Sequence, residues 1–157
     1  MPEELADLTP EMKAAINREG PPATYEVTSL GIRTFARSIG YTNPIYYDAE
    51  AARAKGYRDL VAPPGYYGMP VFDPSRPAAE AATFASPFTR NLNGGTEVEP
   101  LAAVCAGDVL EARSRLTKLE LAKGRLGQML VRVTETVYTR RSDGMVVGRT
   151  RGTGLSY

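Results

Sequence analysis

The C-terminal half of the sequence alternates strictly between apolar and polar residues, and this pattern restricts the possible folds more than any other feature. In the segment 109–117, Leu110, Ala112 and Leu116 fall on one side of an extended chain and charged residues on the other. The same period of two continues through 129–137. This period is typical of strands that bury one face. We therefore expect a sheet that other elements of the chain cover on one side.

Two further strands are expected in this half, at 94–101 and 146–153, with a turn at 142–144 before the last one. The last strand has a nearly bare face, which carries Gly148, Gly152 and Gly154. Glycines repeated on one face predict that a helix or another backbone packs closely against them.

The first half of the sequence favours helices. A short helix is predicted at 10–18, with Thr9 as its N-cap, and a second begins at Thr28 or Ser29 and stops at Gly40. A third covers 49–55, where Asp48 is placed to cap it. These helices are the available cover for the strands, so the predicted class is α+β.

The segments between these helices and the strands are less regular. Residues 23–27 are predicted as a short strand. The stretch 61–77 contains five prolines, too many for a regular sheet strand, and we expect it to be ordered and irregular. Residues 78–86 follow it as a possible helix.

Length and charge exclude several classes of function. The 157 residues suit one domain, and 19 basic against 18 acidic residues leave a net charge of +1. Such a balance favours neither nucleic acid nor an anionic membrane surface as a partner. No apolar run approaches the roughly 20 residues that span a bilayer. The N-terminus is acidic and contains Pro, unlike a signal peptide, so we expect a cytoplasmic protein.

Cysteine and histidine usage narrows the chemistry. The single cysteine, Cys105, excludes an internal disulfide, and its apolar neighbours predict a small buried side chain. The absence of histidine excludes Ser-His-Asp and Cys-His catalysis and histidine-ligated zinc. We expect no metal and no cofactor. Proton transfer by this chain alone requires a carboxylate, a tyrosine or a lysine.

The segment 38–48, SIGYTNPIYYD, resembles the hydratase motif of MaoC-like (R)-specific enoyl-CoA hydratases and dehydratases, S-G-D-x-N-P-x-H-x-D. A second stretch, AVCAGDVLEAR, resembles the family's P-V-x-x-G-D-x-L turn. The resemblance extends over residues 20–155 and is greatest to the non-catalytic N-terminal half of double-hot-dog members. The matching residues are Gly40, Asn43, Pro44, Asp48, Gly107, Asp108 and Leu110.

This resemblance implies a hot-dog fold, in which a curved antiparallel sheet wraps around a central helix. It implies one domain over 1–157, with 1–20 as an N-terminal helical extension. It also implies a homo- or heterodimer with another hot-dog chain and an acyl-CoA or other acyl-thioester substrate. In the family, an Asp and a His act on a water that adds across the double bond of the acyl chain. Here, Tyr41 and Tyr46 stand at those two positions.

The two tyrosines therefore indicate that this chain has lost the catalytic role. A phenol has a pKa near 10 and stays protonated at neutral pH, so it cannot replace the carboxylate as a base. Either the two rings line the substrate or they fill the vacated space. The residues predicted to contact substrate are Gly40, Tyr41, Asn43, Tyr46, Gly65 and Tyr66.

Two of the predicted site residues have alternative interpretations. Gly65 follows two prolines and either offers a backbone N–H at a helix start, as an oxyanion donor, or forms a structural kink. Asp48 is either a helix cap or an unconventional catalytic base.

Three functions remain open. In the first, the chain is a hydratase or dehydratase subunit that shapes the acyl pocket of a catalytic partner. In the second, it is a homo-oligomeric hydratase or thioesterase that uses a carboxylate such as Asp48. In the third, it is a non-enzymatic module that binds acyl-CoA or another hydrophobic ligand.

Overall fold

The computed structural model describes residues 5–75, 84–125 and 127–157. Its helical elements are α1 (Pro10–Ala15), α2 (Ser29–Ser38), the 3-10 helix η1 (Pro44–Tyr46) and α3 (Ala49–Ala54). Its strands are β1 (Ala23–Glu26), β2 (Met69–Pro70), β3 (Asn91–Pro100), β4 (Val109–Gly124), β5 (Gly127–Arg140) and β6 (Val146–Ser156). They form one antiparallel sheet in the order β2-β1-β4-β5-β6-β3.

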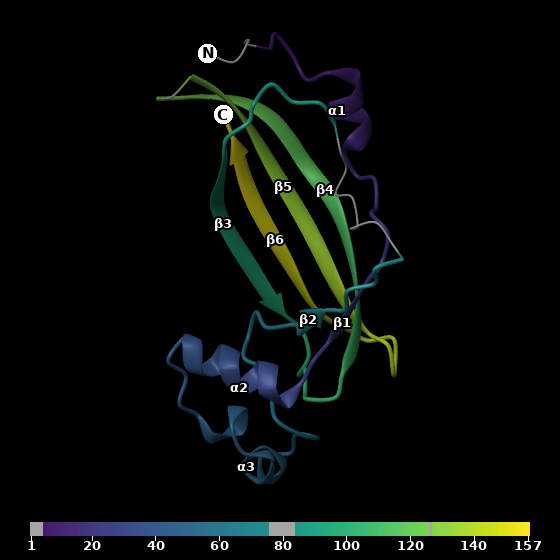
Figure 1. Ribbon diagram of the computed structural model, residues 1–157, viewed down its shortest axis with the longest axis vertical. Coiled ribbons are helices and arrows are strands. Elements are labelled where there is room, and N and C mark those ends of the chain that lie inside the picture. Colours follow the sequence, from purple (N-terminus) through teal and green to yellow (C-terminus); the bar gives the residue numbers. More distant parts are fainter. Residues whose placement is uncertain (1–4, 76–83, 126) are drawn as a thin grey trace.

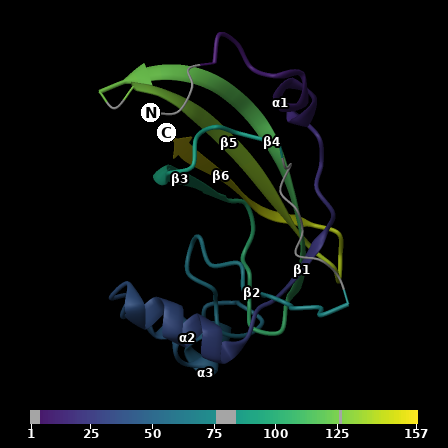
Figure 2. The same ribbon diagram turned by 45° about the horizontal axis from the view of Figure 1, so that its top comes forward.

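The sheet is long, twisted and curled, and the helices lie toward its ends (Figures 1 and 2). In Figure 1, α2 and α3 lie beyond the lower end of the strands, whereas α1 lies beside the upper part of β4. The loops that carry the hydratase-like motif are therefore held at one end of the sheet.

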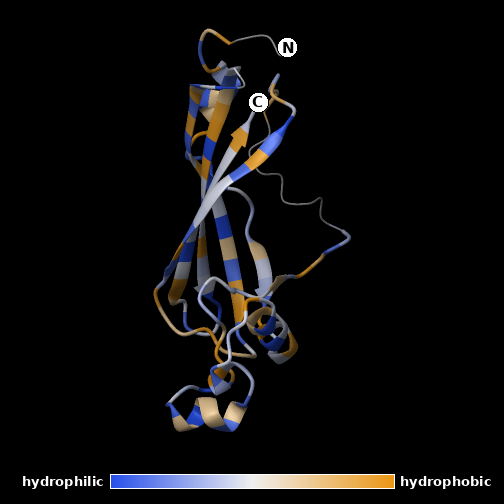
Figure 3. Cartoon of the chain, turned by 90° about the vertical axis from the view of Figure 1, so that its left-hand side faces the viewer, coloured by the Kyte–Doolittle hydropathy of each residue, from blue (hydrophilic) through white to orange (hydrophobic). Residues whose placement is uncertain are grey.

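The strand predictions for the C-terminal half are confirmed, and the strands are longer than the alternating segments alone indicated. Figure 3 shows the alternation as bands of hydrophilic and hydrophobic residues along the strands. The prediction that the Pro-rich stretch 61–77 forms no sheet strand is wrong at Met69 and Pro70. These two residues form β2, which pairs with β1 at the sheet edge, where a proline costs no ladder hydrogen bond. Most of the possible helix at 78–86 lies outside the described residues, and 84–86 are not helical.

The three helix starts are capped as predicted. The Thr9 hydroxyl accepts a hydrogen bond from Met12 N–H at 3.3 Å. The Thr28 hydroxyl accepts one from Gly31 N–H at 3.1 Å. The Asp48 side chain accepts one from the first turn of α3. These bonds satisfy backbone donors that a helix leaves unpaired in its first turn.

The core consists of two separate clusters on the same face of the sheet. One joins α2 and the Pro-rich segment to the lower strands, through Ile32, Leu60 and Leu110. The other joins α1 to the upper strands, through Met12 and Leu130. Since the two clusters do not merge, the middle of this face is not filled by apolar side chains. Cys105 is buried, as its apolar sequence neighbours predicted.

The close packing predicted for the glycines of the last strand occurs at Gly148 but not at Gly152, and a tyrosine side chain makes it in place of the predicted helix or backbone. A Cβ on Gly148 would lie 2.1 Å from the Tyr67 hydroxyl, so this glycine makes room for a ring. A Cβ on Gly152 would meet nothing within 4 Å. Close packing therefore occurs at the lower end of β6, and the face opens farther along the strand.

The described residues contain no helix that is both long and apolar enough to cross a membrane.

Candidate functional site

The hydratase-like motif forms the connection between α2 and α3. Gly40, at the end of α2, has a φ of +75°, a conformation that glycine adopts without strain. Asn43 then caps η1, where its side-chain oxygen accepts a hydrogen bond from Ile45 N–H at 3.2 Å. The connection is therefore a defined turn that fixes where the side chains of Tyr41 and Tyr46 lie.

Tyr41 and Tyr46 pack against each other. Their ring centroids are 5.7 Å apart and the rings are 27° from parallel. Tyr41 is exposed, and Tyr46 is half-buried against the lower core cluster. Burial, and then the neighbouring phenols of Tyr41 and Tyr57, raise the pKa of Tyr46 above its ordinary value. Tyr46 is therefore neutral at physiological pH, able to donate a hydrogen bond but not to act as a ready base.

Tyr46 lines a hollow of about 380 Å³ at this end of the sheet. The walls come from the Pro-rich segment and from the loop between β3 and β4. Among the described lining residues there are four tyrosines and no ionisable Asp, Glu, Lys or Arg side chain, the tyrosines being Tyr46, Tyr57, Tyr66 and Tyr67. Such a hollow suits an apolar group and offers phenol donors, but it provides no acid–base pair at neutral pH.

Gly65 also lines this hollow, but not as the start of a helix. It lies in a turn, closed by a 3.0 Å hydrogen bond from Tyr66 N–H to the Pro63 carbonyl, and its φ is +89°. The alternative that Gly65 begins a helix is therefore wrong, and the structure shows the kink instead. The positive φ explains the glycine, because other residues rarely adopt it.

Tyr66 and Tyr67 line the hollow and also belong to the lower core cluster. The Tyr66 ring lies 5.0 Å from that of Phe35, and Tyr67 stacks on Tyr138 at 4.1 Å. Both hydroxyls are buried, and neither has a hydrogen-bond partner in the described parts of the chain. Burial raises the pKa of both phenols. The sequence pointed to Tyr66 but missed Tyr67, whose position depends on the distant Gly148.

The structure thus brings together only some of the predicted residues. Tyr46, Gly65 and Tyr66 share one hollow, and Tyr41 contacts it through the ring of Tyr46. Gly40 and Asn43 shape the turn but do not line the hollow. The Asp48 carboxylate accepts a hydrogen bond from Glu50 N–H at 2.9 Å and so caps α3.

A second hollow, of about 450 Å³, lies on the covered face of the sheet. Its lining mixes apolar and polar groups and includes Tyr25, Phe84, Leu116, Arg132, Thr134 and Gly154. Leu116 belongs to the upper core cluster and Tyr25 packs on the lower one. The hollow therefore lies in the interval between the two clusters, and its lining also includes Arg18 and Arg115.

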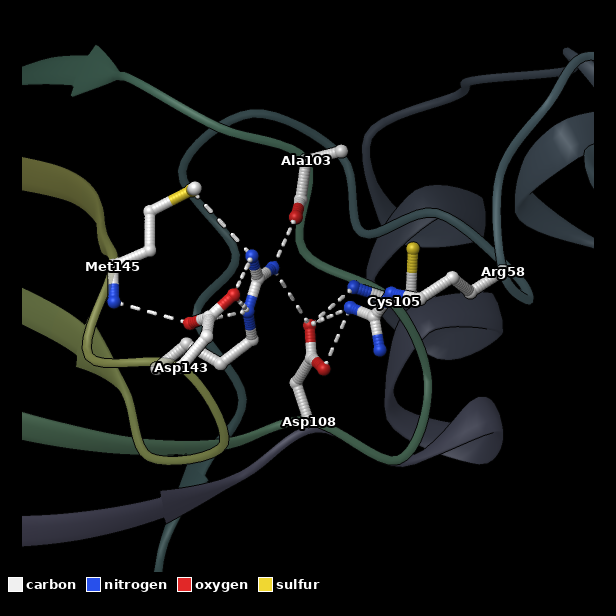
Figure 4. Close-up of polar contacts among 7 residues, drawn as sticks. Arg58, Ala103, Cys105, Asp108, Asp143 and Met145 are labelled. Atoms are coloured by element: carbon white, nitrogen blue, oxygen red, sulfur yellow. Dashed lines mark hydrogen bonds and ion pairs between the residues drawn. The ribbon is translucent and has the colours of Figure 1, made fainter.

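An ionic cluster around the buried Asp108 carboxylate supports the loop that walls the first hollow (Figure 4). Asp108, only 4% exposed, accepts two hydrogen bonds from Arg58, at 2.8 and 2.9 Å, and one from Cys105 N–H at 2.9 Å. Arg140 lies 3.6 Å from the same carboxylate and donates to the Ala103 carbonyl at 3.0 Å. Asp108 matched the family motif in the sequence, but its partners come from distant segments that the motif could not identify.

No cluster of three or more His, Cys, Asp or Glu side chains arranged to hold a metal ion is found in the described residues.

Comparison with known proteins identifies relatives along nearly the whole chain. The family described as "FAS1-like, dehydratase domain region" matches residues 14–149. A UPF0336 protein of Streptomyces coelicolor is 30% identical over 140 residues, which cover 88% of this chain and 91% of the relative. A UPF0336 protein of Leifsonia xyli is 34% identical over 114 residues, covering 72% and 76%.

Solved structures share the fold. The ChsH1–ChsH2 complex from Mycobacterium tuberculosis has a chain with a TM-score of 0.70 and 22% identity, covering 92% of this chain and 90% of that one. A chain of the HadBC complex from the same organism, described as a 3R-hydroxyacyl-ACP dehydratase, has a TM-score of 0.62 and 20% identity, covering 87% and 95%. An (R)-hydratase from A. caviae has a TM-score of 0.60 and 12% identity, covering 88% and 94%. The predicted hot-dog architecture is thereby confirmed.

Proposed function

Since the chain belongs to the FAS1-like dehydratase-region family and has the hot-dog fold of MaoC-like dehydratases, we propose that it is a non-catalytic subunit of an acyl-thioester dehydratase. In this role it shapes the acyl-binding cavity of a partner hot-dog chain that carries the catalytic Asp and His. The observation that carries the proposal is that Tyr41 and Tyr46, at the two motif positions, stack on each other.

The chemistry of the first hollow supports a non-catalytic role for this chain beside a catalytic partner. Hydration of an enoyl thioester needs a base to take a proton from water and an acid to return one. Burial keeps the phenol of Tyr46 protonated, and the other described lining groups are apolar side chains, backbone and further tyrosines. In the proposed complex these groups exclude water and pack against the substrate, while the partner moves the protons.

The second hollow is the proposed place for the acyl chain. Its volume of about 450 Å³ lies within the range of small-molecule sites, and it lies between the two core clusters. Gly154 contributes no side chain to this lining, and a Cβ there would lie 3.9 Å from Arg132. The space is therefore kept open by a small residue and is not closed by neighbouring groups.

Two structural relatives support a paired assembly, because each comes from a complex named for two chains, ChsH1 with ChsH2 and HadB with HadC. The proposed partner of this chain is likewise a second hot-dog chain with an intact catalytic motif.

The proposal is tested by co-expressing this chain with a hot-dog protein that carries the intact Asp and His motif, which we expect to be encoded beside it. We expect the purified pair to hydrate an enoyl-CoA and this chain alone to be inactive, with the partner alone as the control. Full activity of the single chain would contradict the proposal and favour a homo-oligomeric enzyme. Saturable acyl-CoA binding without turnover, with any partner, would instead favour a binding module.

The acyl-chain assignment is tested by Gly154→Val in the pair. A Cβ at this position would lie 3.9 Å from Arg132, and the methyl groups of valine extend farther and narrow the hollow. We therefore expect a lower kcat/KM for long-chain enoyl-CoA and little change for a four-carbon substrate. Thr153→Val, whose side chain points to the opposite face of β6, is the matched control. An equal effect on both chain lengths would place the acyl chain elsewhere.

A further inference from the structure

The second hollow carries positive charge as well as apolar surface. Arg18, in the segment before β1, and Arg132, on β5, both belong to its lining, together with Arg115. The described part of the lining contains no Asp or Glu side chain. A purely apolar ligand would take water away from these guanidinium groups without replacing its hydrogen bonds, which is unfavourable. The charge of the wall therefore favours a ligand that carries an anionic group.

Arg132 differs from the other arginines of the long strands in having no carboxylate partner. Six arginines lie in β4, β5 and β6, and five of them form an ion pair: Arg113, Arg115, Arg140, Arg149 and Arg151. Among the described residues, neither Arg132 nor Arg18 forms one. The lining of the second hollow thus contains two cations whose charge the described residues do not neutralise.

Neutral groups hold the half-buried Arg132 side chain in place. Its Nη2 donates a hydrogen bond to Asn91 Oδ1 at 3.0 Å, and Ser156 Oγ donates to the same oxygen at 2.6 Å. These bonds orient the guanidinium without cancelling its charge. Since a guanidinium has five N–H donors, most of them remain for a ligand.

Gly154 leaves this guanidinium open to the hollow. It stands opposite Arg132 in the register of β5 and β6. A Cβ on Gly154 would lie 3.9 Å from both Nε and Nη2 of Arg132, and apart from the neighbours of Gly154 in the chain no other described heavy atom comes within 4 Å of that position. This edge of the guanidinium therefore borders free space, where a carboxylate can accept its hydrogen bonds.

The two cations lie at the far end of the second hollow, away from Tyr25. Tyr25 meets Tyr138 edge-on at 5.7 Å, and Tyr138 stacks on Tyr67, which lines the first hollow, at 4.1 Å. Arg132 precedes Tyr138 on β5 by the six residues from 132 to 138, a length of roughly 20 Å at about 3.4 Å per residue. Arg18 lies beside the same part of β4, because Asn17 N–H bonds the Leu116 carbonyl. A long acyl chain with its thioester at the first hollow would therefore bring its other end to the cations.

From this arrangement we infer that the second hollow binds an acyl group that ends in a carboxylate, which Arg132 and Arg18 hold. The substrate class is then the monothioesters of long dicarboxylic acids. This inference rests on the proposed function for the thioester itself. The preference for an anionic end rests on the lining of the second hollow alone.

The test is a calorimetric titration of the full chain with two saturated long-chain acyl-pantetheine thioesters of equal length, one ending in a methyl group and one in a carboxylate. We expect the carboxylate-ended thioester to bind about tenfold more tightly, as a charge-assisted hydrogen bond predicts. Arg132→Gln should remove most of this preference. Arg132→Lys should keep part of it, because lysine keeps the charge but loses the planar fork. The control, Arg37→Gln, removes an exposed arginine that lines neither hollow and should leave the preference unchanged.

Arg18→Gln covers the case in which Arg132→Gln folds poorly, since Arg18 is exposed, and it should lower the preference by a smaller factor. Equal affinity of the unchanged chain for the two thioesters, or binding of neither, would overturn the inference. So would a preference that survives both substitutions.

The same titration with CoA thioesters distinguishes the two sources of an anion. Pantetheine lacks the nucleotide phosphates of CoA, so a carboxylate site gives the same preference with both carriers. If Arg132→Gln weakens both CoA thioesters equally and neither pantetheine thioester, the hollow binds a CoA phosphate and the carboxylate assignment is wrong.

These measurements involve neither turnover nor a partner chain, so the two proposals fail separately. Equal affinity for the two ends would leave the proposed function standing with an uncharged acyl chain. An inactive pair would leave the preference for the carboxylate standing.

Discussion

At the scale of single residues, the motif side chains differ in burial and in whether they line a hollow. Tyr46 is half-buried at the first hollow, whereas Tyr41 is exposed and meets the hollow only through its contact with Tyr46. Asp48, the one carboxylate of the motif, is exposed and bonded to the backbone of α3. The described lining of both hollows lacks Asp48, so its geometry supports the capping role.

Replacement of Asp48 distinguishes capping from catalysis. Asp48→Ala should lower the free energy of unfolding by about 1 kcal/mol, while Asp48→Asn, which also caps well, should change it by only a few tenths. Denaturant titration measures both. Loss of turnover in Asp48→Asn at an unchanged melting temperature would identify the carboxylate as catalytic and contradict this expectation.

At the scale of elements, the strands followed from the sequence because their alternation is local. The packing between elements could not be predicted in this way, because it depends on the register in which the strands pair. Gly148 receives the Tyr67 ring while Gly152, on the same face, meets nothing, and no local pattern separates the two glycines. The helix caps were predictable, since each acts within its own first turn. The hollow between the core clusters was not, since it requires knowing which strands lie side by side.

The two glycines allow a matched comparison. Gly148→Ala should lower the free energy of unfolding by about 1–3 kcal/mol, because the new methyl group overlaps a ring that is stacked on Tyr138 and cannot easily move. Gly152→Ala meets no atom and should be neutral or slightly stabilising, since alanine suits a strand better than glycine. Thermal unfolding measures both variants. A Gly148→Ala variant as stable as Gly152→Ala would show that the Tyr67 ring moves aside.

The ion pairs of Glu135 with Arg115 on β4 and Arg151 on β6 make stability depend on pH. The hydrogen bond from Arg115, aided by Arg151, holds the pKa of Glu135 below its ordinary value. Its contribution is therefore complete above about pH 4.3, the unfolded reference, and is lost as pH falls through the lower folded pKa. Glu135→Gln should cost about 1–2 kcal/mol at pH 7. The difference in melting temperature from the unchanged chain should shrink toward about pH 2; a constant difference would exclude the charge as its source.

At the scale of the whole molecule, the ionic cluster around Asp108 joins regions that are far apart in the sequence. Arg58 follows α3, Asp108 precedes β4 and Arg140 ends β5, so one buried carboxylate connects the motif-bearing loops to the sheet. Its bond from Cys105 N–H also fixes the loop between β3 and β4, which walls the first hollow. The cluster thus links the stability of the fold to the shape of the candidate site.

Asp108→Asn should therefore affect both properties. Removal of the buried negative charge leaves Arg58 and Arg140 less compensated and should cost about 2–3 kcal/mol of unfolding free energy, measured by denaturant titration. In the proposed pair, KM for the enoyl-CoA should rise more than kcat falls, because the proposal assigns this loop to positioning substrate and not to the reacting groups. Asp7→Asn, which disturbs an exposed ion pair with Lys13, should change neither quantity.

The outer edge of β3, the last strand on one side of the sheet, bears on the chain before it meets a partner. Exposed strand edges nucleate aggregates, since each added strand presents a fresh edge to the next. The irregularity between Asn93 and Gly95 shortens the regular stretch, and Glu97 and Glu99 place charged side chains along this edge, a feature that disfavours the addition of further strands. We therefore expect the isolated chain to stay in solution without precipitating when it is made in excess.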